Sequence, residues 1–292
     1  MARIAIIGGG SMGEALLAGL LRSDRHAKDM VVSERMPTRA KYLSETYAVQ
    51  VTSSVVDAAE NATYVIVAVK PSDVESVVTA IAEAAANSDT DSVEQVFVTV
   101  AAGVSTAFYE SKLPAGSPVI RVMPNAPALV GAGVSALAKG RFATAEQLKE
   151  VAELFDCVGS VITVPESQLD AVTAVSGSGP AYFFLLVEAL VDAAVGVGLP
   201  RPIATDLAVQ TMAGSAAMLL ERLDQGGEGA AGAGLGNGVD TTAAQLRATV
   251  TSPGGTTAAG LRELERGGLR AAVAEAVDAA KKRSEQLGIT SE

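Results

Sequence analysis

An apolar run that ends in a glycine-rich turn is the feature of this sequence that most restricts its fold. Residues 4–7 are isoleucine-rich and indicate a buried strand. Gly8, Gly10 and Gly13 follow with the spacing G-x-G-x-x-G, and leucines at helical spacing come after them. In such turns the first glycine makes the bend, the second admits a pyrophosphate, and the third lets helix and strand pack closely. The strand, turn and helix therefore predict a bound dinucleotide, against the alternatives of a structural turn or another adenine-containing cofactor.

Further apolar runs alternate with helical stretches along the first half of the chain. Their nearly continuous hydrophobicity is typical of strands that are buried on both faces of a sheet. Strands that alternate with helices predict a doubly wound, parallel α/β sheet, which binds ligands beyond the carboxyl ends of its strands. We predict such strands at residues 4–7, 30–35, 64–69, 96–100, 119–123, 131–139 and 161–164, and a helix at 145–155.

The end of the second predicted strand gives two conflicting indications about the cofactor. Glu34 lies 21 residues after Gly13, about where NAD-binding proteins place an acid against the adenosine ribose. Arg35 is instead suited to the 2′-phosphate of NADP, and Ser33 can add a hydrogen bond. Both cofactors stay open, as does a reading of Glu34 and Arg35 as surface charges. Lys70, the only ammonium group at these strand ends, is either a ligand contact or a solvated charge.

The pattern changes near Pro165, after which only helical segments follow. We therefore predict two domains, a dinucleotide-binding Rossmann domain at 1–165 and an all-helical substrate-binding and dimerisation domain at 166–292. The helical part carries more apolar surface than it can bury alone, which predicts a homodimer through these helices. A glycine- and alanine-rich segment, 226–239, is typical of a flexible loop. The predicted helices lie at 168–175, 180–197, 202–223, 256–266 and 269–286.

Composition excludes several classes of partner and site. The net charge of −11 argues against nucleic acids and anionic membranes, and acids within the most apolar helix argue against a membrane span. Cys157, the single cysteine, suits a reducing compartment. The first strand starts close to Met1, so we expect no signal peptide and a cytoplasmic protein. His26 is the only histidine, so we expect no histidine-based triad and no metal site.

The distribution of lysines restricts the reaction. No lysine lies between Lys149 and Lys281, although dehydrogenases that oxidise hydroxy acids need a lysine or histidine there to accept the hydroxyl proton. Reduction of a C=N bond is less demanding, because a protonated imine accepts hydride readily once it is held against the nicotinamide. The missing base therefore favours imine reduction.

Two polar, glycine-rich stretches in the helical part could hold a substrate. Residues 176–180, SGSGP, precede the longest apolar helix, and they are also consistent with a purely structural helix start. Residues 250–257, VTSPGGTT, lie directly before another helix. The backbone N–H groups at that helix start, with the hydroxyls of Ser252, Thr256 and Thr257, predict a site for a small carboxylate.

Five motifs together give a specific resemblance over nearly the whole chain. They are GGGSMG at 8–13, AVKP at 68–71, RVMPN at 121–125, SGSGPAY at 176–182 and TSPGGTT at 251–257. In this order and spacing the chain resembles the pyrroline-5-carboxylate reductases. The resemblance implies NADPH-dependent reduction of the cyclic imine Δ1-pyrroline-5-carboxylate to L-proline, the last step of proline biosynthesis, with NADH as the other cofactor open to it. It also implies a dimer through the helical domain, often assembled as a decamer of five dimers.

The resemblance also implies roles for individual residues. Thr257 would be the catalytic residue, with a hydrogen bond to the ring nitrogen of the substrate. The substrate carboxylate would be held by the loop residues Ser252, Gly254, Gly255, Thr256 and Thr257. The cofactor would be lined by Gly8, Gly10, Ser11, Met12, Gly13, Ser33, Arg35, Ala68, Val69, Lys70, Pro71, Ala101, Ala102 and Asn125.

The chain departs from the family pattern at three places. Ala126 stands where threonine is usual, Ala248 stands where an acid is common, and segment 226–239 looks like an insertion. Two other hypotheses remain open from the sequence. One is a relative of the β-hydroxyacid dehydrogenases, against which the missing lysine counts, and the other is a non-catalytic NADP-sensing protein.

Overall fold

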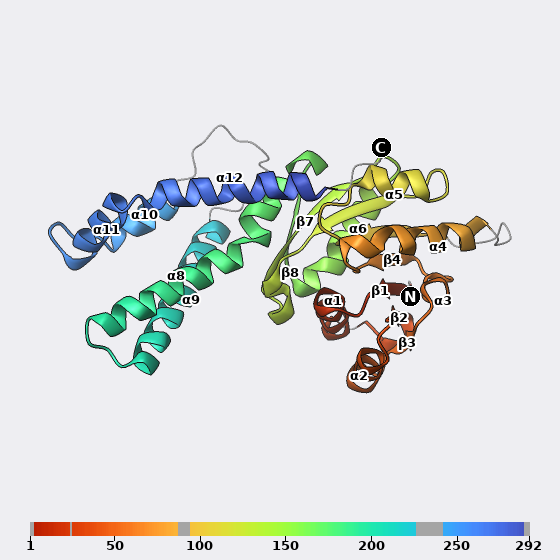
Figure 1. The fold of residues 1–292 in the computed structure, drawn as a ribbon, viewed down its shortest axis with the longest axis horizontal. Helices are drawn as coiled ribbons and strands as arrows, with labels where there is room; N and C mark the ends of the chain where they lie inside the picture. The colour runs from red at the N-terminus through yellow and green to blue at the C-terminus, as the bar shows by residue number, and fades with distance from the viewer. Residues whose placement is uncertain (1–2, 24, 87–93, 226–241, 289–292) are drawn as a thin grey trace. The chain divides into compact units, whose positions relative to one another are not determined.

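The computed structural model describes residues 3–23, 25–86, 94–225 and 242–288. By internal contacts the chain divides into two compact units. The first unit, Met1–Pro180 with Val277–Glu292, is a sheet covered by helices, and the second, Ala181–Ala276, is helical throughout its described residues (Figure 1). The predicted loop at 226–239 lies outside the described residues.

Eight strands of the first unit form one sheet in the order β3-β2-β1-β4-β5-β6-β7-β8. The first six positions have the strand order of a Rossmann fold, in which strands 1 and 4 lie next to each other at the topological switch point. This arrangement confirms the predicted α/β class. The strands are β1 Ile4–Ile7, β2 Met30–Ser33, β3 Gln50–Thr52, β4 Tyr64–Val67, β5 Val96–Thr99, β6 Val119–Met123, β7 Gly133–Lys139 and β8 Gly159–Thr163.

Both faces of the sheet are buried, and alternate residues of each strand belong to different cores. Ile4 and Ile6 of β1 join one hydrophobic cluster, whereas Ala5 and Ile7 join the other. All four side chains are almost fully buried, which explains why the strand has no polar face. The first core includes helices α1 Ser11–Arg22, α2 Pro37–Tyr47 and α6 Ala145–Phe155; the second includes α3 Val55–Ala59, α4 Val74–Ala86 and α5 Thr106–Lys112.

The sheet is not wholly parallel, so that part of the expectation was wrong. Strand β7 runs antiparallel to β6, and β8 is parallel to β7. Only nine residues separate β6 from β7, whereas a parallel crossover needs a dozen or more. The short connection, which contains the 3-10 turn Ala126–Val130, therefore forces the chain to return in the opposite direction.

Several element ends also differ from the prediction. Strand β2 ends at Ser33 and β4 at Val67, so the charged residues that follow each strand lie in the loops. Strand β3 and helix α3 were not predicted, because β3 has only three residues and none of them is fully buried. By contrast, β6 and α6 have the predicted bounds.

The described part of the second unit consists of helices and their connections. Helix α7, Leu169–Val172, continues into a π-helical turn, Thr173–Gly177, before the unit begins. The unit then contains all but the first two residues of α8 Gly179–Gly196, followed by α9 Arg201–Gln225, α10 Thr242–Thr249, α11 Thr256–Arg266 and the start of α12 Leu269–Leu287. No described residue after Thr163 is in a strand, as predicted.

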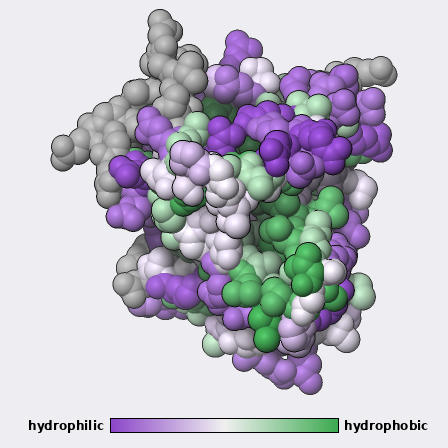
Figure 2. All heavy atoms as spheres, turned by 90° about the vertical axis from the view of Figure 1, so that its left-hand side faces the viewer, coloured by the Kyte–Doolittle hydropathy of each residue, from purple (hydrophilic) through white to green (hydrophobic). Residues whose placement is uncertain are grey.

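Helices α8 and α9 expose large apolar side chains. Figure 2 shows hydrophobic side chains gathered on one face of the molecule. By length and composition alone, Glu166–Gly196 and Arg201–Leu223 could each cross a membrane, so the expectation of no membrane contact stays a prediction. The exposed residues of the two helices include Phe183, Phe184, Leu185, Leu186, Leu190, Ile203, Leu207, Met218, Leu220 and Leu223.

Candidate active site

The glycine-rich turn after β1 has the geometry that its spacing predicts. Gly8 has a φ of +108°, and its N–H donates to the Ser33 carbonyl at 2.9 Å. A Cβ at Gly8 would lie 2.8 Å from the Ala68 carbonyl oxygen, and a Cβ at Gly13 would lie 2.0 Å from the Gly8 carbonyl oxygen. A Cβ at Gly10 would meet nothing within 4 Å. Gly8 and Gly13 thus serve the backbone packing, whereas the space at Gly10 is open to a ligand.

Helix α1 begins in this turn without a side-chain cap. The first N–H that bonds back to the turn is that of Glu14, which donates to the Gly10 carbonyl at 2.9 Å. The preceding N–H groups, those of Ser11, Met12 and Gly13, have no acceptor among the described residues, as helix geometry requires. These free donors and the positive end of the helix dipole fit the phosphates of a dinucleotide.

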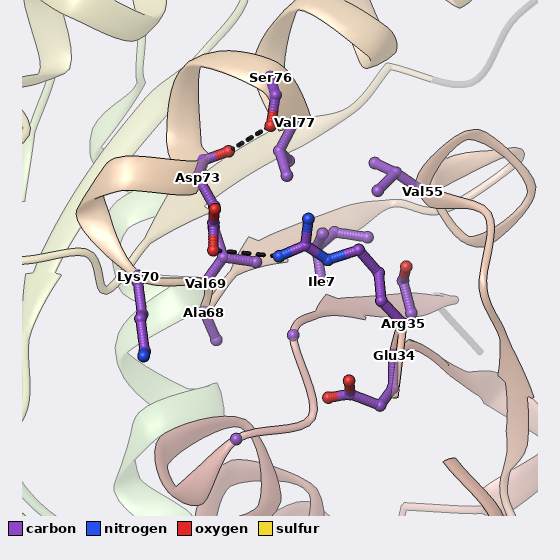
Figure 3. Close-up of a pocket in the computed structure, with 13 residues that line it drawn as sticks. Ile7, Glu34, Arg35, Val55, Ala68, Val69, Lys70, Asp73, Ser76 and Val77 are labelled. Atoms are coloured by element: carbon purple, nitrogen blue, oxygen red, sulfur yellow. Dashed lines mark hydrogen bonds and ion pairs between the residues drawn. The ribbon is translucent and has the colours of Figure 1, made fainter. Parts of the chain in front are cut away.

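A pocket of about 320 Å³ opens beside the turn, at the carboxyl ends of β1, β2 and β4 (Figure 3). It unites seven of the predicted cofactor residues with six others. Asp73, Val55, Ser76 and Val77 were not predicted, because they lie in helical segments or turns that carry no ligand motif. The lining consists of Ile7, Gly8, Gly10, Ser33, Glu34, Arg35, Val55, Ala68, Val69, Lys70, Asp73, Ser76 and Val77.

The structure gives Glu34 a role in the turn itself. Its carboxylate accepts hydrogen bonds from the N–H of Gly9 at 3.1 Å and of Met36 at 2.8 Å. Arg39 donates to the Gly9 carbonyl at 2.7 Å, so charged side chains hold both sides of this residue. In Figure 3 the Glu34 carboxylate points toward the turn. Glu34 therefore anchors the glycine-rich turn through backbone donors.

A second acid supports this anchor from α1. Glu14 pairs with Arg39 and accepts a hydrogen bond from the Tyr47 hydroxyl at 2.8 Å. Burial raises the pKa of Glu14, but the hydrogen bonds from Arg39 and Tyr47 outweigh it and leave the pKa lowered. Burial and the bond to Glu14 raise the pKa of Tyr47 to about 12. The network therefore remains a charged pair with a protonated phenol at neutral pH.

Arg35 follows β2, and its guanidinium pairs with the Asp73 carboxylate at 3.2 Å; both residues line the pocket. Ser33, which also lines the pocket, is only 4% exposed. Lys70 also lines the pocket, and no ion pair to it is found among the described residues. Arg35 and Lys70 are thus the two cations among the residues that line the pocket.

Seven other predicted cofactor residues lie outside the pocket lining. Ser11, Met12 and Gly13 form the first turn of α1, and Pro71 begins a 3-10 turn, Pro71–Asp73. Ala101 is buried, and its N–H donates to Thr99 Oγ1 at 3.2 Å, whereas Ala102 is exposed. The Asn125 side chain accepts from the Val134 N–H at 2.9 Å and donates to the Ser176 carbonyl at 3.2 Å. Their contacts with a cofactor stay predictions.

The Ser176 stretch forms a π-helical turn. The Ser178 N–H donates to the Thr173 carbonyl at 2.8 Å, which is the i to i−5 bond of a π-turn. A Cβ at Gly177 would lie 3.0 Å from the Met123 methyl group. π-helical turns are rare in proteins, and those that occur often lie at functional sites. Here the contact with Met123 also gives a packing reason for the glycine at position 177.

The predicted carboxylate loop lies within the second unit, and several of its donors have no acceptor in the described part of the chain. Gly255 caps α11 without a side-chain hydrogen bond, and the first N–H bonded back to it is that of Ala259, at 3.1 Å. The N–H groups of Thr256 and Thr257 have no acceptor within the described ranges. Their hydroxyls and that of Ser252 are likewise without partners there. This concentration of donors at a helix start fits a carboxylate.

Tight backbone geometry holds this loop in shape. Gly254 has a φ of +68°, which disfavours residues with a Cβ, and a Cβ at Gly255 would lie 2.5 Å from Ser252 Oγ. Thr251 Oγ1 donates to the Arg247 carbonyl of α10 at 2.6 Å.

As for metals, no group of three or more His, Cys, Asp or Glu residues that could hold an ion occurs in the described part of the chain.

Comparisons with known proteins place the chain in a family. A family model described as pyrroline-5-carboxylate reductase dimerisation matches residues 166–287. One described as NADP oxidoreductase coenzyme F420-dependent matches residues 3–103. A curated pyrroline-5-carboxylate reductase of Mycobacterium tuberculosis is 72% identical over 292 residues, which are 100% of this chain and 99% of the relative. The chain belongs to the pyrroline-5-carboxylate reductase family.

Other pyrroline-5-carboxylate reductases agree in sequence and structure. The relative from Corynebacterium melassecola is 42% identical over 288 residues, 99% of each chain. A solved structure from Coxiella burnetii has a TM-score of 0.86 at 32% identity and covers 99% of both chains. One from Plasmodium falciparum, solved with NADP bound, has a TM-score of 0.79 at 27% identity and covers 99% of this chain and 98% of that one. The resemblance and the fold are thereby confirmed.

Two of the departures from the usual reductase pattern lie in described segments. Ala126 is exposed and begins the 3-10 turn between β6 and β7. The Ala248 carbonyl accepts the Thr251 N–H at 3.1 Å, next to the carboxylate loop. Neither position requires a larger or charged side chain for the local backbone structure.

Proposed function

We propose that this protein reduces Δ1-pyrroline-5-carboxylate to L-proline with NADPH, the last step of proline biosynthesis. The observation that carries the proposal is the 72% identity to a named pyrroline-5-carboxylate reductase over all 292 residues. The missing lysine between Lys149 and Lys281 agrees with it, because an imine needs no such base.

The first unit has the groups that a dinucleotide requires. The free N–H groups of Ser11, Met12 and Gly13 would bind the pyrophosphate, and Arg35 with Ser33 would bind the 2′-phosphate. The Arg35 guanidinium in the pocket favours NADPH, because only NADPH carries the 2′-phosphate that it would bind. When bound, NADPH supplies a hydride to the imine carbon.

The carboxylate loop would orient the substrate. The free N–H groups at the start of α11, with Ser252 and Thr256, would bind the carboxylate, and the backbone of Gly254 and Gly255 shapes the loop. The Thr257 hydroxyl would donate to or accept from the ring nitrogen and so fix the face of the imine. The protein would then act mainly by orienting the substrate, so that the imine carbon and no other ring atom faces the nicotinamide.

The family model for dimerisation over residues 166–287 supports a homo-oligomer. We propose that the exposed apolar side chains of α8 and α9 are buried against a second copy of the chain, with a decamer of five dimers as the larger assembly. The protein would then need no membrane or nucleic-acid partner and would act in the cytoplasm. The functional boundary of the two domains is proposed at residue 165.

The test follows the absorbance of the reduced nicotinamide when pyrroline-5-carboxylate is added with NADPH or NADH. We expect kcat/KM to fall about tenfold or more in Thr257→Ala, the usual cost of a hydrogen bond to a charged group, and Thr257→Ser to restore most of it. Thr249→Ala is the matched control, because among the described residues the Thr249 hydroxyl bonds only to the Leu246 carbonyl of its own helix.

The outcomes separate the hypotheses. Wild-type protein that binds NADPH without oxidising it on addition of the imine would exclude the reductase and favour a sensor. Normal kinetics in Thr257→Ala would leave the reductase in place but remove the role of Thr257.

A further inference from the structure

An ion pair closes one side of the cofactor pocket. Arg35 follows strand β2, and Asp73 ends the 3-10 turn that follows β4, so the pair joins two walls of the pocket. Figure 3 shows the guanidinium turned toward the Asp73 carboxylate, and the two groups are 3.2 Å apart. The Arg35 side chain is 72% exposed and that of Asp73 is 32% exposed.

The neighbouring acid, Glu34, bonds to backbone N–H groups and forms no ion pair with Arg35 in the described part of the chain. Both oxygens of Glu34 accept backbone N–H groups, from Gly9 and from Met36. Among the described residues, Asp73 is therefore the one ion-pair partner of Arg35. Any phosphate that uses Arg35 must displace the Asp73 carboxylate or share the guanidinium with it.

We propose that Asp73 sets the preference between NADPH and NADH by competing with the 2′-phosphate for Arg35. The inference rests on the proposed function in its use of a nicotinamide cofactor. NADPH must draw the Arg35 guanidinium from the Asp73 carboxylate to its 2′-phosphate, which carries about two negative charges. NADH has no 2′-phosphate and can bind with the pair intact. Asp73 therefore weakens the binding of NADPH and leaves that of NADH unchanged.

The exposure of the pair makes this competition reversible. Exposed ion pairs are weak because water screens the charges and two long side chains must be held still. A phosphate offers the guanidinium a stronger, bidentate partner. The phosphate therefore displaces Asp73, and the cost of displacement appears as a reduced preference for NADPH.

The test uses the adenosine parts of the two cofactors, with and without the 2′-phosphate, so it needs no turnover. Adenosine 2′,5′-bisphosphate and adenosine 5′-monophosphate are titrated by calorimetry into the wild type and Asp73→Asn. We expect the variant to bind the bisphosphate about fivefold more tightly, or about 1 kcal/mol, the upper range for an exposed pair. The monophosphate should bind with unchanged affinity. Glu75→Gln is the matched control, since Glu75 pairs with Lys112 at 3.0 Å outside the pocket lining.

A double-mutant cycle separates competition from simple charge repulsion. In an Arg35→Ala background, Asp73→Asn should change bisphosphate affinity by less than about twofold, because there is no guanidinium left to compete for. A fivefold gain that persists in this background would overturn the competition. The ratio of kcat/KM for NADPH to that for NADH should rise in Asp73→Asn to the same extent as the binding ratio.

The other results are also decisive. Bisphosphate affinity that is unchanged or lower in Asp73→Asn overturns the inference while the proposed reductase stands. A wild-type protein that binds neither nucleotide nor NADPH overturns the proposed function and the inference together.

Discussion

The Glu166 carboxylate links the 3-10 turn after β8 to helix α5 and strand β6, and its removal tests how much this link stabilises the fold. Glu166 accepts hydrogen bonds from the Thr106 N–H at 2.8 Å and the Thr106 hydroxyl at 2.6 Å. It also pairs with Arg121 of β6 at 3.2 Å. Thr106 is the first residue of α5, so the carboxylate also lies at the positive end of that helix dipole.

The size of the effect follows from the burial of the partners. The Arg121 side chain is 9% exposed and that of Glu166 is 28% exposed. Removal of one partner from a buried pair costs about 3–5 kcal/mol, because the other charge is left without compensation. Water can reach the space left by Glu166, so we expect Glu166→Ala to lower the free energy of unfolding by about 3 kcal/mol, the lower end of that range. Glu166→Gln keeps an acceptor for Thr106 and should lose roughly half as much.

The assay is urea unfolding followed by far-ultraviolet circular dichroism. All variants are compared at one protein concentration, because dissociation of an oligomer makes the transition depend on concentration. Glu153→Ala is the control, since Glu153 is an exposed residue of α6, and it should change the free energy of unfolding by less than about 0.5 kcal/mol. A loss below about 1 kcal/mol in Glu166→Ala would refute the reasoning that the pair behaves as a buried one.

Two further predictions concern the turn and a buried phenol. Gly13→Ala places a Cβ 2.0 Å from the Gly8 carbonyl oxygen, so we expect about 2 kcal/mol lost in urea unfolding and no NADPH binding in calorimetry. Gly10→Ala meets no such contact and should stay within about 1 kcal/mol of the wild type; equal losses would contradict this. Burial and a carboxylate hydrogen bond raise the pKa of Tyr64 from 10.0 to about 12. The protonated phenol is favoured in the folded state, so its stabilisation is complete below pH 10 and is lost as the pH rises through 12. Urea unfolding measured between pH 9 and 12 should therefore show a smaller loss of unfolding free energy with rising pH in Tyr64→Phe than in the wild type. Equal losses in the two proteins would exclude this.

Much of the first unit could be predicted because its strands are buried on both faces. A strand such as β1 needs an apolar residue at every position, since successive side chains enter opposite cores. The bounds of β6 agree with the prediction for the same reason, and those of α6 and α11 agree as well. The glycine spacing likewise predicted the turn, because backbone contacts at Gly8 and Gly13 leave no room for a Cβ.

Other elements carried too weak a signal. Strand β3 has three partly exposed residues, and its place at the sheet edge depends on pairing with β2. The direction of β7 was available from the short connection that precedes it, but its residue pattern is the same for either direction. The π-turn at 173–177 has the sequence of an ordinary helix, and only its hydrogen bonds distinguish it.

The sequence by itself determined the Rossmann class, the helical second half and the family, and it predicted which residue types would face a dinucleotide and a carboxylate. These follow from local patterns, in which each residue acts through its immediate neighbours in the chain. The tertiary structure decided which charges meet. It turned Glu34 toward the backbone of the glycine turn and brought Arg35 to Asp73, 38 residues away. Such pairings depend on where strands β1, β2 and β4 end in the sheet, and no pattern within one short stretch of the sequence shows this.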